Sequence, residues 1–300
     1  MKHLYFVLFI FVCFGLVVGC KSPQKPRQTY FYECTDSYGR HVTLAKEPQR
    51  IVSLSPALTE IIYLIGAQDK LVGVTDYCNY PEEAKQKPRL GDLQNINFES
   101  LLSTQPDVVL ISSIVSKQDV EKMEKMGIPV IALKEEKRLE GMADVMRAVG
   151  KISNHQQRAN NLADQWLQRI QFIKQENKQI KHHSKSVYYV VGFGETGDFT
   201  APKNSHIHEI ITLAGCQNVG EVLTGWNINR EYLFQTNPDI IIVREEDYNA
   251  FCTLYPYTQL KAVQQHQVYP INSSWMDIVT PRNLLAVERI KQLALLSDKK

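Results

Sequence analysis

Two groups of residues in this chain have spacings that could serve cofactor or metal binding. The segment GFGETG, at 192–197, follows a predicted strand and fits the G-x-G-x-x-G pattern of a dinucleotide-binding turn. The residues after it, DFTAPKN, are typical of a turn, whereas the dinucleotide pattern requires a helix to begin at the third glycine. The histidine pairs at 182–183 and at His206 and His208 lack the further ligands of a closed zinc site, and we expect His206 and His208 to be exposed at a helix end.

Hydrolase motifs are missing from the sequence as well. The chain contains no G-x-S-x-G segment and no H-E-x-x-H segment. The acidic residues expected near a cleft, Asp76, Asp92 and Asp277, have no base obviously paired with them. We therefore expect a protein that is not an enzyme and that holds no metal ion or cofactor of its own.

Several aromatic side chains instead occupy loops where a ligand could bind. In a parallel sheet, the loops after the carboxyl ends of the strands line the ligand crevice. Aromatic rings and methionine offer flat or polarizable surfaces to a large, partly apolar ligand. The candidate ligand-binding residues in or beside such loops are Ser55, Pro56, Tyr77, Phe193, Gly194, Trp226, Ser274, Trp275 and Met276.

The elements that must position these loops occur twice. The chain contains INFESLLSTQPDVVLI at 96–111 and INREYLFQTNPDIIIV at 228–243, which share Ile, Asn, Glu, Leu, Thr, Pro and Asp at the same offsets. The segment TEIIYLIGAQ, from Thr59, likewise matches HEIITLAGCQ, from His208. Two matches in the same order indicate a duplicated structural unit.

Each half of the chain alternates predicted strands and helices. The first half has the strands IVSL, LVGVT, DVVLIS and PVIAL, and the second half repeats the order with SVYYVV, DIIIV and QVYPI. We also expect a helix near 249–263 and a closing helix at about 281–296. Alternation of this kind predicts a parallel sheet covered by helices, and the aliphatic runs VVLI and IIIV suit strands buried on both faces.

A long helical pattern lies between the halves, from Ser153 to about Lys181. Its apolar residues recur at one-turn spacing, and Ser153 and Gln156 match a capping box at its start. A helix of about 28 residues would be roughly 42 Å long. We predict an α/β protein of two Rossmann-like lobes with parallel sheets, joined by one long backbone helix. The predicted domains are an N-terminal lobe at 30–150, the connecting helix at 151–182 and a C-terminal lobe at 183–300, with a ligand cleft between the lobes.

The N-terminus has the features of an export signal. A short positive start precedes the apolar run LYFVLFIFVCFGLVVG, which is shorter than a membrane-spanning helix. The residues VVG before Cys20 resemble a bacterial lipoprotein cleavage site, so 1–20 is a predicted signal peptide and Cys20 a predicted lipidation site. The polar segment 21–29 would be a tether. We expect the folded part outside the cytoplasm, held in the cell envelope by a lipid anchor.

The composition argues against a nucleic-acid partner. The formal net charge is only +2, from 34 basic and 32 acidic residues spread along the chain. An exported location permits disulfides, but the sequence leaves the pairing of Cys34, Cys78, Cys216 and Cys252 open. We expect a monomer.

Three parts of the chain carry a family resemblance: RIVSLSPALTEIIYLIGAQDKLVGVTDYCNYP, the paired I-N-x-E segments and SSWMDIVTPR. They resemble the substrate-binding proteins of ABC importers for cobalamin and iron chelates, the class with a helical backbone. The resemblance implies capture of cobalamin or a related corrinoid between the lobes and its delivery to a permease dimer. It also implies that Glu99 and Glu231, at the tips of the lobes, contact arginines of that permease. Each glutamate lies in the first turn of a helix that Asn97 or Asn229 can cap, where the helix dipole favours a carboxylate in any case.

A haem receptor or a ferric-siderophore receptor of the same family is the alternative. Haem receptors of this family tend to carry an iron-binding tyrosine where this chain has Asp92, which counts against haem but does not exclude Tyr77 or Met276 as an axial ligand. An anionic siderophore would require cationic groups in the cleft, and Arg282 is available but is expected to be structural at a helix start.

The match to the cobalamin receptors is itself incomplete. Tyr77, Phe193 and Trp275 match aromatic positions of the cobalamin receptors, and Trp226 lies within one residue of another. Leu93 departs from them, because the cobalamin receptor has tryptophan there. Outside this family, a surface enzyme acting on a tetrapyrrole or chelate and a sensory lipoprotein without a transporter are the rival interpretations.

Overall fold

A computed structural model of the chain describes residues 29–92, 94–112, 114–134, 137–179 and 185–297. The predicted signal peptide at 1–20, with the lipidation site Cys20, lies outside the described residues, as does most of the predicted tether at 21–29. No helix in the described part of the chain combines the length and the apolar character needed to cross a membrane.

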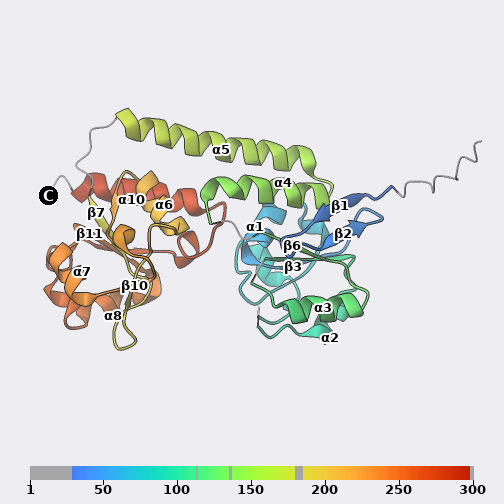
Figure 1. Cartoon of the computed structure of the whole chain (residues 1–300), viewed down its shortest axis with the longest axis horizontal. Coiled ribbons are helices and arrows are strands. Elements are labelled where there is room, and N and C mark those ends of the chain that lie inside the picture. The colour runs from blue at the N-terminus through green and yellow to red at the C-terminus, as the bar shows by residue number, and fades with distance from the viewer. Residues whose placement is uncertain (1–28, 93, 113, 135–136, 180–184, 298–300) are drawn as a thin grey trace, which may run out of the picture.

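Two separate four-stranded parallel sheets form the centres of two lobes (Figure 1). Their strands are β3 (Ile51–Leu54), β4 (Leu71–Val74), β5 (Val108–Ser112), β6 (Val130–Leu133), β7 (Ser186–Tyr189), β9 (Gln217–Asn218), β11 (Ile240–Arg244) and β12 (Val268–Ile271). The first sheet has the order β4-β3-β5-β6 and the second the order β9-β7-β11-β12. Each strand of the first sheet thus has a counterpart at the same place in the second, which confirms the predicted α/β fold of two lobes with parallel sheets.

Helices cover both faces of these sheets. The helices of the first half are α1 (Pro56–Leu64), α2 (Phe98–Ser103), α3 (Lys117–Lys125) and α4 (Met142–Ile152), with three-ten turns η1 (Gln68–Lys70), η2 (Glu82–Gln86) and η3 (Leu139–Gly141). Those of the second half are α6 (His206–Leu213), α7 (Arg230–Thr236), α8 (Tyr248–Thr253), α9 (Lys261–Gln264) and α10 (Asn283–Ser297), with η4 (Val219–Val222), η5 (Glu245–Asp247), η6 (Tyr257–Gln259) and η7 (Ser273–Trp275). The stretches 108–111 of β5 and 240–243 of β11 are buried, as the aliphatic runs predicted.

One predicted helix is broken in the structure. The helix expected near 249–263 is divided into α8, the turn η6 and α9. Pro256 lies at the break, and a proline has no N–H to continue the hydrogen-bond ladder of a helix.

The long connecting helix α5 (Gln156–Gln179) crosses above both lobes in Figure 1. Its 24 residues make it about 36 Å long. The capping box expected at Ser153 is wrong, because Ser153 ends α4 and its hydroxyl donates to the carbonyl of Val149 at 2.8 Å. The sequence did not reveal α4, which packs along α5. A Cβ atom on Gly150 of α4 would lie only 2.2 Å from Cβ of Ala159, so glycine permits this close contact.

The apolar core continues from one lobe into the other through these helices. One cluster of buried side chains contains Ile61 of α1, Val149 of α4, Trp166 of α5, Ile210 of α6 and Ile290 of α10. Two smaller clusters fill the opposite face of each sheet. A shared core of this kind opposes large rotations of the lobes, because close-packed interiors deform little.

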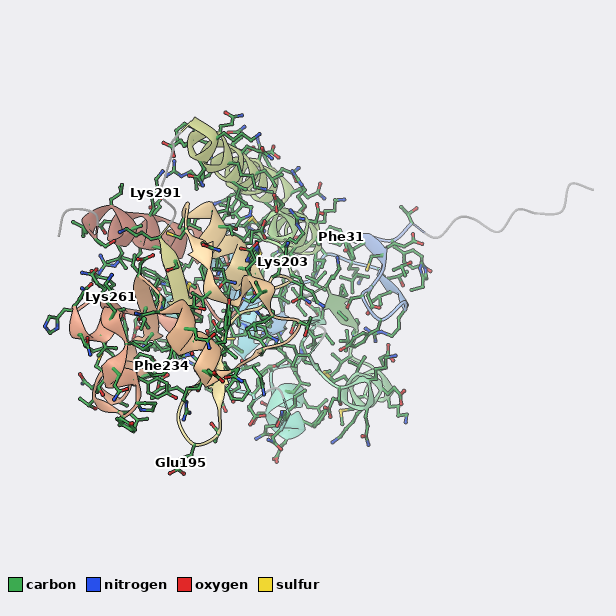
Figure 2. All side chains as sticks on the ribbon, turned by 60° about the vertical axis from the view of Figure 1, so that its left-hand side comes forward. Phe31, Glu195, Lys203, Phe234, Lys261 and Lys291 are labelled. Carbon is green, nitrogen blue, oxygen red and sulfur yellow. The ribbon has the colours of Figure 1, made fainter. Side chains whose placement is uncertain are left out.

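Two short pairs of antiparallel strands complete the described fold, and neither was predicted. The strands β1 (Tyr32–Thr35) and β2 (His41–Leu44) form one pair, and β8 (Asp198–Phe199) and β10 (Asn227–Ile228) form the other. The GFGETG segment therefore leads into β8 and not into a helix, as expected from the turn-like residues after it. Figure 2 shows Glu195 at the outer end of this loop, away from the body of its lobe.

Candidate ligand-binding site

A cavity of about 510 Å³ lies between the two lobes. The N-terminal lobe lines it with residues from the loops that follow β3, β4, β5 and β6, and with Met142 and Val145 of α4. The C-terminal lobe contributes residues of the segment 272–282, which follows β12. The cavity thus occupies the carboxyl ends of parallel strands, where ligands bind in open α/β sheets.

Four of the predicted ligand-binding residues line this cavity: Ser55, Pro56, Tyr77 and Ser274. Ser55 and Pro56 are placed by the start of α1, where the fixed φ of proline suits the first helical position. Ser274 lies in the turn η7, where the side chain of Asn272 accepts a hydrogen bond from its backbone N–H at 3.1 Å.

The other predicted ligand-binding residues are not part of the lining. Phe193 contacts the rings of Phe251 and Tyr257 edge-on, with centroid distances of 5.2 and 5.8 Å, and the N–H of Gly194 donates to the Tyr257 hydroxyl at 2.9 Å. Trp226 is exposed beside β10. A contact of these three residues with a ligand stays a prediction.

The two residues after Ser274 turn away from the cavity. Trp275 packs against the core shared by the lobes, and Met276 is fully buried within that core. The sequence left Met276 open as an axial iron ligand, but in this structure its side chain has no exposed surface from which to reach a ligand.

The rim of the cavity carries apolar surface that the sequence only partly revealed. Tyr77 is 58% exposed, and Tyr80 and Ile114 beside the same cavity are also exposed. Tyr80 follows Tyr77 in the loop after β4, so a closer reading of TDYCNYP would have found it. Ile114 gave no such signal, because it lies beside Val115 in an otherwise polar loop after β5, with no aromatic residue to mark it.

An ion pair between the lobes forms part of the cavity wall. Nε of Arg282 donates to Oε2 of Glu60 at 3.0 Å, and Nη2 donates to Oε1 of the same carboxylate at 2.5 Å. The guanidinium also lies 4.1 Å from the ring centroid of Tyr80. Burial raises the pKa of the Glu60 carboxyl, and the neighbouring Arg282 opposes that rise. The expectation that Arg282 starts a helix was close, since α10 begins one residue later, but its side chain belongs to the site.

Asp277 brings a second ion pair to the lining. Its carboxylate accepts hydrogen bonds from the hydroxyl of Tyr189 at 2.6 Å and from Nε of Arg244 at 2.8 Å. Burial, and then the Asp277 charge, raise the pKa of the Tyr189 hydroxyl, so this phenol is protonated. The carboxylate is therefore held by two donors and is not placed as a general base.

The charges that line the cavity balance one another. Glu60 and Asp277 are acidic, and Lys134 and Arg282 are basic. The lining combines this balance with apolar side chains from both lobes, which suits a bulky ligand of low net charge.

The tips of the two lobes carry matching acidic residues. Asn97 caps α2 by accepting from the N–H of Ser100, and Asn229 caps α7 by accepting from the N–H of Glu231. Glu99 and Glu231 lie in the first turns of these helices, are exposed and do not line the cavity. In Figure 1, α2 and α7 lie on the sides of their lobes away from α5.

Histidine and cysteine side chains show no metal site in the part of the chain that the structure describes. His206 is not an exposed helix-end residue as expected, because it is largely buried with Nε2 2.6 Å from the carbonyl oxygen of Met276. His208 is half-buried. Cys34, Cys78 and Cys252 carry free thiols. The histidines at 182–183 lie outside the described residues.

Comparison with known proteins places the chain in a family. Residues 51–274 match the periplasmic binding protein family. An uncharacterized ABC transporter substrate-binding lipoprotein, YvrC, of Bacillus subtilis (strain 168) is 28% identical over 293 residues, which are 93% of this chain and 92% of that protein. The vitamin B12-binding protein of Pectobacterium atrosepticum is 29% identical over 253 residues, which are 82% of this chain and 89% of that protein.

Solved structures agree with this assignment. The periplasmic vitamin B12 binding protein of Vibrio cholerae superposes with a TM-score of 0.70 at 25% identity, over 85% of this chain and 99% of that one. A periplasmic haem-binding protein of Roseiflexus sp. RS-1 reaches a TM-score of 0.74 at 20% identity, over 83% of this chain and 98% of that one, which is a likeness of fold alone. The chain therefore belongs to the periplasmic binding protein family, in the class whose two α/β lobes are joined by a helical backbone.

Proposed function

We propose that this chain is the extracytoplasmic substrate-binding component of an ABC importer, and that it captures cobalamin or a related corrinoid between its lobes. The observation that carries the proposal is the cavity between the lobes, lined by the strand ends of one and by the segment 272–282 of the other. Capture of this kind is binding and release, so the chain is not an enzyme in this role. The likeness to named vitamin B12-binding proteins supports the ligand class.

The character of the cavity supports a corrinoid over an anionic chelate. Tyr77 and Tyr80 present aromatic surface at its rim, and the two acidic and two basic side chains of the lining leave no net charge to attract an anion. A ferric siderophore would instead be favoured by an excess of cationic groups.

A haem receptor is the second candidate, and one observation favours it. Tyr77 is exposed at the cavity rim, where its phenol oxygen is accessible to an iron centre. With Met276 buried, Tyr77 is the remaining one of the two residues that the sequence did not exclude as axial ligands.

Titration of the purified chain separates these ligands. Cyanocobalamin, haemin and a panel of ferric siderophores would each be added while tryptophan fluorescence is recorded, because a coloured ligand near Trp226 or Trp275 quenches it. We expect saturable quenching by cyanocobalamin at a lower concentration than by haemin or any siderophore. Saturation by haemin alone would replace the corrinoid proposal with the haem proposal, and no saturation by any ligand would contradict both.

We propose further that Glu99 and Glu231 contact a permease dimer. Each is exposed in the first turn of a capped helix, and the two helices are counterparts in the duplicated lobes. Two equivalent acidic residues suit a partner with two-fold symmetry and paired basic side chains. A lipid on Cys20 would hold the receptor, as a monomer, at the membrane where that permease lies.

A further inference from the structure

The ion pair between Glu60 and Arg282 is unusual among the polar contacts between the lobes. Glu60 belongs to α1 of the N-terminal lobe, and Arg282 immediately precedes α10 of the C-terminal lobe. The Glu60 side chain is 1% exposed and that of Arg282 is 12% exposed, and two hydrogen bonds join them. A planar guanidinium matches a carboxylate in this two-point geometry, so the pair fixes direction as well as distance.

Arg282 also connects the pair to the walls of the cavity. Nη1 of Arg282 donates to the hydroxyl of Ser274 at 2.8 Å, and the guanidinium covers the ring of Tyr80. Ser274 belongs to the C-terminal lobe and Tyr80 to the N-terminal lobe, and both line the cavity. The placement of these two side chains therefore depends on the same guanidinium.

Other ion pairs that involve the connecting helix are more exposed. Arg169 of α5 contacts Glu288 of α10 at 2.8 Å with both side chains about half exposed, and Lys291 of α10 contacts Glu176 of α5 at 3.1 Å. Solvent and salt screen such surface pairs. Opening of the lobes would expose or separate the buried pair, whereas the surface pairs are already hydrated.

We propose that Glu60 is a positioning residue which, through Arg282, holds the lobes in the closed geometry and so sets how long a ligand stays in the cavity. Loss of one partner leaves an unpaired charge in the closed form, and water can reach that charge when the lobes separate. The variant population then shifts toward the open form, from which ligand leaves. This inference rests on the proposed function only in taking the cavity as the ligand site.

Dissociation kinetics of the purified chain test the inference. Bound radiolabelled cyanocobalamin would be chased with excess unlabelled cyanocobalamin, and the loss of label from the protein would be followed for wild type, Glu60→Gln and Arg282→Lys. We expect dissociation to accelerate about tenfold or more in Glu60→Gln, and less in Arg282→Lys, which keeps the charge but loses the two-point contact. The double variant Glu60→Gln with Arg282→Gln should accelerate dissociation no more than Glu60→Gln alone, because the two residues act as one unit.

A matched control separates this role from general stability. Asp36 and Arg40 form an ion pair within the N-terminal lobe in which the Asp36 side chain is 0% exposed, and neither residue lines the cavity. Asp36→Asn should lower the thermal unfolding temperature without changing the dissociation rate. The inference is overturned if Glu60→Gln lowers the unfolding temperature while the dissociation rate stays at the wild-type value, or if Asp36→Asn accelerates dissociation equally.

Backbone hydrogen exchange without ligand gives a second measurement that does not depend on the ligand's identity. Amides of α1 and of the segment 272–282 should exchange faster in Glu60→Gln than in wild type, and those of the two sheets should not. If cyanocobalamin fails to bind the wild-type chain, the corrinoid proposal is refuted and this measurement still decides the role of the pair. Unchanged exchange in both segments would refute it.

Discussion

Charge reversal at the tips of both lobes should abolish import while leaving ligand binding intact. The change is Glu99→Lys combined with Glu231→Lys. Both side chains are exposed and neither lines the cavity, so we expect the affinity for cyanocobalamin to stay within about twofold of wild type. Both N-caps are kept, because Asn97 and Asn229 accept hydrogen bonds from backbone N–H groups.

The expected magnitudes follow from this geometry. A carboxylate in the first turn stabilises a helix by about 0.3–1 kcal/mol through the helix dipole, and reversal of the charge roughly doubles the change. The unfolding temperature should therefore fall by only a few degrees. A charge-assisted hydrogen bond contributes about 1.5–3 kcal/mol, so the loss of two at the permease should weaken docking by more than about a hundredfold.

Uptake of cyanocobalamin by cells that carry each variant is the assay, with binding and thermal unfolding measured on the purified proteins. The matched control is Glu33→Lys with Glu246→Lys, which makes the same charge change at exposed sites, one in each lobe and outside α2 and α7. The tip variant should lose uptake and the control should keep it. Full uptake by the tip variant, or equal loss in the control, would refute the docking proposal.

Three further predictions concern the backbone helices, the cavity rim and pH. Gly150→Ala should destabilise the chain by about 1–3 kcal/mol in thermal unfolding, because the new Cβ would lie 2.2 Å from Cβ of Ala159. The control Gly225→Ala should not destabilise the chain, because the space around Gly225 is open. Tyr77→Phe should keep the affinity for cyanocobalamin in the fluorescence titration, and Tyr77→Ala should lower it about tenfold, because the aromatic face and not the hydroxyl contacts the ligand. A large loss of affinity in Tyr77→Phe would show that the hydroxyl binds the ligand and would contradict this prediction. Burial lowers the pKa of His206 below its ordinary value of about 6.5, although the Met276 carbonyl and the Asp277 charge oppose this shift. As the pH falls through 6.5, the unfolded chain therefore binds more protons than the folded chain. The stabilising effect of neutral His206 is therefore present above pH 6.5 and lost as the pH falls below it. In denaturant titrations, the difference in free energy of unfolding between wild type and His206→Gln should shrink on acidification. A difference that stays constant with pH would contradict this.

The sequence was sufficient for the large features of the fold because they are encoded locally and encoded twice. The buried runs of β5 and β11 are aliphatic on both faces, and the same Asn and Glu open α2 and α7. Each half independently predicts the same alternation, so an error in one half is checked by the other. The apolar stripe of α5 similarly identified the connecting helix, although the start was misplaced.

The features that the sequence did not reveal depend on contacts between distant segments. The pairing of β1 with β2 and of β8 with β10 involves very short strands without a clear alternation of apolar residues. Arg282 lies 222 positions from Glu60, so no local pattern could have shown that its side chain meets a buried carboxylate. The same applies to the rings of Phe251 and Tyr257 that hold Phe193. Loop order predicted which strand ends line the cavity, but not which side chains turn into it.

One apolar core runs through both lobes, so the two repeats depend on each other to cover it. Ile61, Trp166 and Ile290 come from three different parts of the chain, yet they exclude water from one continuous interior. Either half produced alone would present its share of that interior to solvent and would tend to associate with other chains.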